Sequence, residues 1–111
     1  MKYMILIYSS PATWNALSQE HRDTMARDHA ALIEELMESG EWVGGDVLAD
    51  PSSSGSVRKG VVTDGPFIEA KEHLAGYDLV DCDSFERAME IAARVPDAEV
   101  CGVEVRPIMD V

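Results

Sequence analysis

The stretch that decides the fold reads Val62-Thr63-Asp64-Gly65-Pro66-Phe67-Ile68-Glu69-Ala70-Lys71-Glu72, and Leu74-Ala75-Gly76-Tyr77 follows it. An alternating strand over residues 57–63 runs into an Asp-Gly-Pro turn, and a charged connection leads to another strand that starts at Tyr77. Glycine and proline fix the backbone of such a turn. We therefore expect Asp64, Lys71 and Glu72 to be held close together.

Working outward from this turn, hydrophobic periodicity predicts the other elements. Ser18 is a good N-cap for a helix that ends at Ser39 with Gly40 as its left-handed stop, and Ser84 or Asp83 begins a second helix that Pro96 ends. Residues 51–56, rich in serine, are predicted to be a flexible hairpin tip. Five strands are expected, at residues 2–8, 42–48, 57–63, 77–82 and 101–106.

The predicted order is therefore β-α-β-β-(β)-α-β. Two helices cannot cover both faces of an antiparallel sheet of four or five strands, so we expect them to pack on one face. The expected fold is α+β, a ferredoxin-like split βαβ sandwich with room for an extra strand. The strand over residues 2–8 is apolar on both of its faces. A second copy of the chain would bury the uncovered face, which predicts a homodimer.

Length and composition disfavour several classes of protein. A chain of 111 residues fits one domain spanning residues 1–111. Its net charge of −12 disfavours binding to nucleic acid. We find no apolar run of the ~20 residues that a membrane span needs, and residues 1–8 lack the features of a signal peptide. Cys82 and Cys101 are too few for a disulfide scaffold or a zinc site, which favours a reducing cytoplasm.

Several motifs together resemble the DGPF-domain branch of the YCII-related family. They are Thr63-Asp64-Gly65-Pro66-Phe67, Lys71-Glu72, Gly76-Tyr77, Ala92-Ala93-Arg94-Val95-Pro96 and Val103-Glu104-Val105-Arg106-Pro107, with His29 in the first helix. The resemblance covers nearly the whole chain in the expected order. It implies a dimeric α+β barrel built from ferredoxin-like protomers, in a family that is largely without an assigned activity.

The chain departs from the wider family at one place. That family pairs the helix histidine with an aspartate just after the first strand, where this chain has Ser10. Two alternatives follow: Asp64 takes the place of the family aspartate, or the chain has no dyad.

His29 is the candidate catalytic residue, since it falls on the apolar stripe of the first helix and should face the sheet. In one interpretation, His29 acts as a general base that Asp64 or Ser10 orients. In the other, it is a buried histidine whose ring is hydrogen-bonded to a backbone carbonyl. Asp64 either points at the pocket or only stabilises its own turn. Ser10, Lys71, Tyr77 and Arg106 are the candidate ligand-binding residues. For the last three, a surface ion pair, a core position and a salt bridge are the respective structural alternatives.

A metal and a cofactor are not expected. His21 and His29 are eight positions apart, so their Cα atoms would be ~12 Å apart along a helix, too far for that helix alone to bring both rings to one zinc ion. No glycine-rich phosphate loop and no nucleophile motif occurs in the sequence. The prediction is a homodimeric small-molecule-binding or accessory module. The alternative is a cofactor-free enzyme that carries out isomerisation or elimination on a small anionic metabolite.

Overall fold

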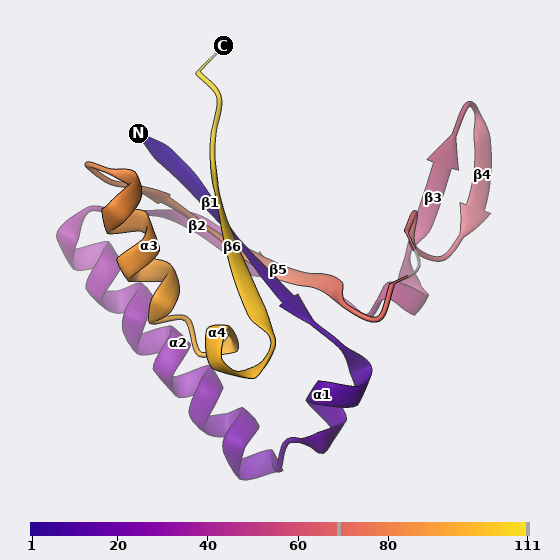
Figure 1. Cartoon of the computed structure of the whole chain (residues 1–111), viewed down its shortest axis with the longest axis horizontal. Coiled ribbons are helices and arrows are strands. Elements are labelled where there is room, and N and C mark those ends of the chain that lie inside the picture. The colour runs from indigo at the N-terminus through magenta and orange to yellow at the C-terminus, as the bar shows by residue number, and fades with distance from the viewer. Residues whose placement is uncertain (69, 111) are drawn as a thin grey trace.

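The computed structural model describes residues 1–68 and 70–110 (Figure 1). The strands are β1 (Lys2–Ser9), β2 (Trp42–Val47), β3 (Gly55–Arg58), β4 (Val61–Asp64), β5 (His73–Asp81) and β6 (Gly102–Pro107). The helices are α1 (Pro11–Ala16), α2 (Gln19–Ser39), α3 (Phe85–Ala93) and α4 (Asp97–Val100), with a 3₁₀ turn η1 at Pro51–Ser53.

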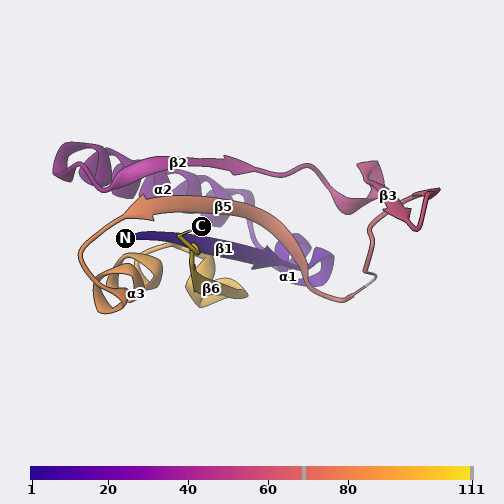
Figure 2. The same cartoon turned by 90° about the horizontal axis from the view of Figure 1, so that it is seen from above.

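The main sheet has four antiparallel strands in the order β2-β5-β1-β6. Its helices α2, α3 and α4 lie on the same side of these strands (Figure 1), and Figure 2 shows β5 and β1 between β2 and β6. This arrangement confirms the predicted ferredoxin-like α+β fold.

The core lies between the helices and one face of this sheet. Alternate residues of β1 face the helices, where they meet α2 and α3, and Val80 of β5 joins them. The buried cluster consists of Tyr3, Ile5, Ile7, Leu32, Leu36, Val80, Cys82, Ala88, Ile91, Ala92 and Val95.

The opposite face of the sheet, which we call the outer face, carries the other residues of β1. Met4, Leu6 and Tyr8 lie on it and are partly exposed. The register places Leu6 between Tyr77 and Glu104 of the neighbouring strands. The middle of the outer face is therefore apolar, with polar groups beside it.

The apolar stripes of α2 and α3 are exposed at their edges. Met37 of α2 is 62% exposed, and Met89 and Phe85 of α3 are 47% and 43% exposed. Each lies at the margin of its stripe, where the sheet no longer covers the helix. Directly after β1, Pro11 begins the short helix α1, which the predicted order of elements does not contain.

The predicted strand over residues 57–63 is wrong. The chain reverses at Lys59 and Gly60, whose φ angles are 50° and 80°, and β3 pairs with β4 as a separate two-stranded sheet. Residues 51–56, predicted to be the hairpin tip, instead form η1 and the start of β3. The β3–β4 hairpin extends away from the main sheet (Figure 1). Within the described residues, no helix is both long enough and apolar enough to cross a bilayer.

Candidate active site

Helix α2 carries the histidine of the site. Ser18 caps its first turn by accepting a hydrogen bond from the backbone N–H of His21 at 3.0 Å, and Gly40 ends it with a φ of 83°. Met25, Leu32 and Leu36 anchor the helix by their buried side chains. His29 lies between Met25 and Leu32 at helical spacing, so its ring is directed at the sheet, as predicted from the stripe.

The ring of His29 contacts Asp78 of β5. The register places Asp78 between Ile5 of β1 and Gly45 of β2, on the face that the helices cover. Only 3% of Asp78 is exposed, although it is an acid in the middle of a strand. Buried carboxylates need a partner, because removing a charge from water costs several kcal/mol.

The partner is His29, whose Nε2 lies 2.7 Å from Asp78 Oδ2. The hydrogen bond to Asp78 raises the pKa of His29, and its effect exceeds the opposing effect of burial. The imidazole side chain stays 21% exposed, against 4% for the carboxylate. The partly exposed imidazole of His29 can therefore take up a proton, and the buried carboxylate of Asp78 stabilises the resulting positive charge.

Gly45 makes room for this carboxylate. A Cβ atom at Gly45 would lie 2.9 Å from Asp78 Oδ1, 2.8 Å from the ring of Trp42 and 2.6 Å from the carbonyl oxygen of Tyr77. These distances are shorter than van der Waals contact allows. The neighbouring Gly44 has no atom within 4 Å of the same position. Of the two glycines, only Gly45 is required by its surroundings.

A second acid, Asp97, lies at the start of α4. Burial raises the pKa of Asp97, while the charge of His29 lowers it and that of Asp78 raises it further. Asp97 in turn raises the pKa of His29 through its charge. Asp78 and Asp97 therefore both favour the charged form of His29.

An open groove of about 810 Å³ runs between α2 and residues 93–100. Asp28 and Pro96, the chain neighbours of His29 and Asp97, contribute to its lining. The groove also carries four glutamates, at positions 34, 35, 38 and 99, against Arg94 and His21. Its rim is therefore acidic.

The structure does not bring the two predicted partners to His29. Ser10 caps α1, where its hydroxyl accepts from the N–H of Thr13 at 3.1 Å and donates to the Thr13 hydroxyl at 2.8 Å. Asp64 ends β4 in the hairpin, opposite Gly55, and is exposed. The hydrogen-bond partner of His29 is instead Asp78.

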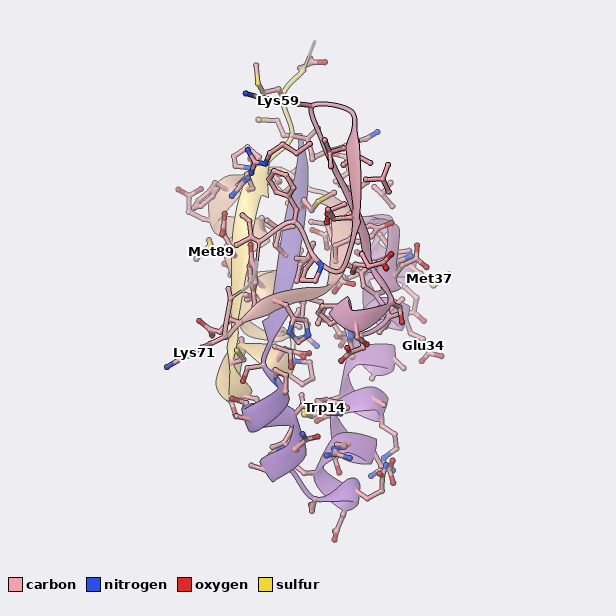
Figure 3. All side chains as sticks on the ribbon, turned by 90° about the vertical axis from the view of Figure 1, so that its right-hand side faces the viewer. Trp14, Glu34, Met37, Lys59, Lys71 and Met89 are labelled. Atoms are coloured by element: carbon pink, nitrogen blue, oxygen red, sulfur yellow. The ribbon has the colours of Figure 1, made fainter. Side chains whose placement is uncertain are left out.

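The predicted ligand-binding residues lie elsewhere as well. Lys71 is exposed before β5 and points into solvent (Figure 3). Tyr77 is on the outer face, where its hydroxyl donates to Asp46 at 3.2 Å. Arg106 shares that face and donates to Glu104 through Nη2 at 2.6 Å. Because His29 is on the helix side of the sheet, these residues do not converge with it within one chain.

Asp78 and Asp97 were not among the predicted site residues. The signal for Asp78 was present: an acid stands between Tyr77 and Leu79 in an apolar strand, two residues from Val80 on the same face. Asp97 gives no comparable signal, because it follows Pro96 in a polar turn. Among the described residues, no group of three His, Cys, Asp or Glu side chains is placed to hold a metal ion.

The sequence is similar to a known domain family and to a known protein. Residues 1–111 match the YCII-related domain. An uncharacterized protein of Rhizobium meliloti (strain 1021) is 31% identical over 114 residues, which cover 97% of this chain and 92% of that protein.

Among solved structures, the fold is similar to that of 5-chloro-2-hydroxyhydroquinone dehydrochlorinase (TftG) from Burkholderia phenoliruptrix AC1100, in complex with 2,5-dihydroxybenzoquinone. The TM-score is 0.56 and the sequence identity 14%, over 98% of this chain and 94% of the other. At this identity the likeness concerns the fold. The match over the full sequence shows that the chain belongs to the YCII-related domain family.

Proposed function

We propose that this protein binds a small oxygen-bearing organic molecule and that the His29–Asp78 pair transfers a proton to or from it. The observation that carries the proposal is the 2.7 Å contact between His29 Nε2 and the buried Asp78 carboxylate. A carboxylate that fixes one nitrogen of an imidazole orients the ring and stabilises its charged form. Proton transfer of this kind needs no cofactor.

The chemistry follows from the two ring nitrogens. Asp78 accepts the hydrogen bond from Nε2–H, which leaves Nδ1 to face the reacting molecule. In the imidazolium form, Nδ1–H donates a proton to a developing oxyanion. Once neutral, Nδ1 accepts a proton from a carbon beside a carbonyl or from a hydroxyl. Protonation of the oxygen followed by removal of the proton from carbon gives an isomerisation with no net change in the protonation of the pair. In an elimination, Nδ1 takes the proton from carbon while the leaving group on the neighbouring carbon departs with the electrons of its own bond, and the imidazolium then returns that proton to solvent.

For the ligand, we propose a small hydroxylated ring or a small organic acid. TftG, which shares the fold, is described in complex with a dihydroxybenzoquinone, a molecule of that size. An acidic hydroxyl or carboxylate suits His29, because the raised pKa of His29 favours its charged imidazolium form. The acidic rim of the neighbouring groove favours a ligand with a single negative charge over a multiply charged one.

A second candidate is a binding or accessory module without turnover. The same raised pKa of His29 favours it, since a histidine that keeps its proton is a cation for holding an anion and is blocked as a base. Such a module would gain stability from the ligand and leave it unchanged.

We also propose three finer assignments. The motif at Asp64-Gly65-Pro66-Phe67 supports membership in the DGPF branch of the family. The apolar middle of the outer face supports a homodimer in which two such faces pack together, with Met4 and Leu6 at the contact. The free thiols of Cys82 and Cys101 suit a reducing cytoplasm.

The test compares His29→Gln and Asp78→Asn with Asp23→Asn, a control at an exposed residue of the same helix that does not line the groove. Each variant is incubated with a panel of hydroxyquinones, catechols and small keto acids, and product formation is followed by chromatography alongside thermal stabilisation. We expect both site variants to lose roughly 10²–10⁴ in turnover, the usual contribution of one acid–base group, with Asp23→Asn unchanged. Turnover that survives both site variants refutes the assignment. Stabilisation by a ligand without turnover in the wild type supports the binding module.

A further inference from the structure

The β3–β4 hairpin is a structural element with no role in the site above. Its two strands pair with each other through four residue pairs and form a sheet of their own. A two-stranded hairpin by itself is only marginally stable in water, and it needs a surface to pack on. The four strands of the main sheet do not extend to include it. The hairpin therefore requires a packing partner from outside its own sheet.

One face of the hairpin carries a pair of valines that is open to solvent. Val57 and Val62 lie directly opposite each other, so both side chains point to the same side. They are 63% and 73% exposed. Phe67 and Ile68, just beyond β4, are 56% and 73% exposed. Such a concentration of large apolar side chains on a projecting element is typical of an interaction surface.

The tip of the hairpin is basic in a strongly acidic chain. Arg58 and Lys59 are adjacent at the turn, and Asp64 is the single acid of the hairpin. The whole chain has nine bases and twenty-one acids. The tip is therefore complementary in charge to the body of another molecule of the same protein. It is not complementary to a basic partner.

The hairpin also extends the molecule beyond the size of a compact domain. The radius of gyration is 15.3 Å, against ~13 Å for a compact domain of this length. Between the hairpin base and the end of the main sheet lies a concavity of about 820 Å³, lined by Tyr8, Val57, Phe67 and Leu74 among others. Tyr8 belongs to the outer face, so the concavity continues that face toward the hairpin.

We propose that the β3–β4 hairpin is an arm that packs its Val57–Val62 face on a second copy of this chain. The arm extends the contact made by the outer faces and directs its basic tip at the acidic body of the partner. Two arms per dimer, one from each copy, bury four valines in addition to the sheet contact. The inference rests on the proposed homodimer and is independent of the chemistry of His29.

The experiment uses the double variant Val57→Lys/Val62→Glu. The lysine and the glutamate at these directly opposed positions attract each other and so stabilise the hairpin. They also remove its exposed valines and leave the net charge of the chain unchanged. The matched control is Met37→Lys/Met89→Glu, at two exposed methionines of α2 and α3 that lie away from the hairpin tip marked by Lys59 (Figure 3). A milder variant, Val57→Thr/Val62→Thr, keeps the β-propensity of both positions. The dimer dissociation constant is measured by sedimentation equilibrium, with circular dichroism as the check on folding.

We expect Val57→Lys/Val62→Glu to raise the dissociation constant roughly 100-fold, because each arm loses the burial of two valines. The threonine variant should raise it by a smaller factor and the methionine control should leave it unchanged. A wild-type dimer whose constant does not respond to either hairpin variant overturns the arm and leaves the sheet contact standing. A wild type that sediments as a monomer at every concentration overturns both the arm and the dimer. Neither result bears on turnover by His29.

Discussion

Replacing His29 by leucine with Asp78 left in place is expected to lower the free energy of unfolding by roughly 2–4 kcal/mol. Breaking a buried ion pair from one side costs about 3–5 kcal/mol, because the remaining charge is stranded. We reduce this figure because the His29 side chain is 21% exposed, so water can reach part of the vacated site. The carboxylate of Asp78 is 4% exposed and keeps most of the penalty.

The double variant His29→Leu/Asp78→Leu should be more stable than His29→Leu alone. Removing both charges leaves no stranded carboxylate, and apolar replacement of a buried pair is often close to neutral. The cycle is completed by Asp78→Leu and is measured by urea unfolding at about pH 6, where unfolded histidine is mostly protonated. A coupling energy below ~0.5 kcal/mol would be indistinguishable from independent sites and would refute a buried, energetically coupled pair.

Three further predictions concern the stability of the fold. Gly45→Ala should lower stability by about 1–3 kcal/mol in thermal unfolding, because its Cβ has no room, whereas Gly44→Ala should be nearly neutral; equal effects of the two substitutions would contradict this. The stabilisation of the fold by the raised pKa of His29 should be fully present below about pH 6.5, the unfolded value, and be lost as the pH rises through the folded pKa. The same His29/Asp78 double-mutant cycle, repeated at several pH values, measures this stabilisation. A coupling energy that grows as the pH rises would contradict the prediction. Arg87→Lys should cost about 1 kcal/mol in urea unfolding, because lysine cannot reproduce the two hydrogen bonds, at 2.9 and 2.8 Å, that Arg87 donates to Glu41; no change would show that solvent screens the contact.

The sequence was sufficient for the main sheet and both long helices, because these elements follow from local signals. Ser18 and Ser84 cap the helices as their residue types predict. The hairpin was missed for an equally local reason. Val57 precedes Lys59 and Gly60, and Val61-Val62-Thr63 follows them, so β-branched residues flank the turn and the pattern predicts one continuous strand. A lysine with positive φ is uncommon and gives no turn signal comparable to Asn-Gly.

The site was only half predictable. His29 follows from helical spacing, which is local. Its partner is 49 residues away in the sequence, and choosing Asp78 requires the register of β5 against β1 and β2. Asp64 was favoured because it lies in a rigid turn, yet that turn belongs to an arm outside the main sheet. A turn motif indicates the backbone conformation and does not indicate which face of the fold it reaches.

The strand order has a consequence for how the protein is made. Of the strands in this domain, β1 is synthesised first, but its neighbours in the sheet, β5 and β6, are synthesised after all the others. Until then, the apolar residues of β1 have no strand to pair with, and the nascent chain must keep them from aggregating. Contacts between such distant segments also slow folding. We therefore expect the sheet to form only after β6 has been synthesised, and a dependence on chaperones when β6 is deleted.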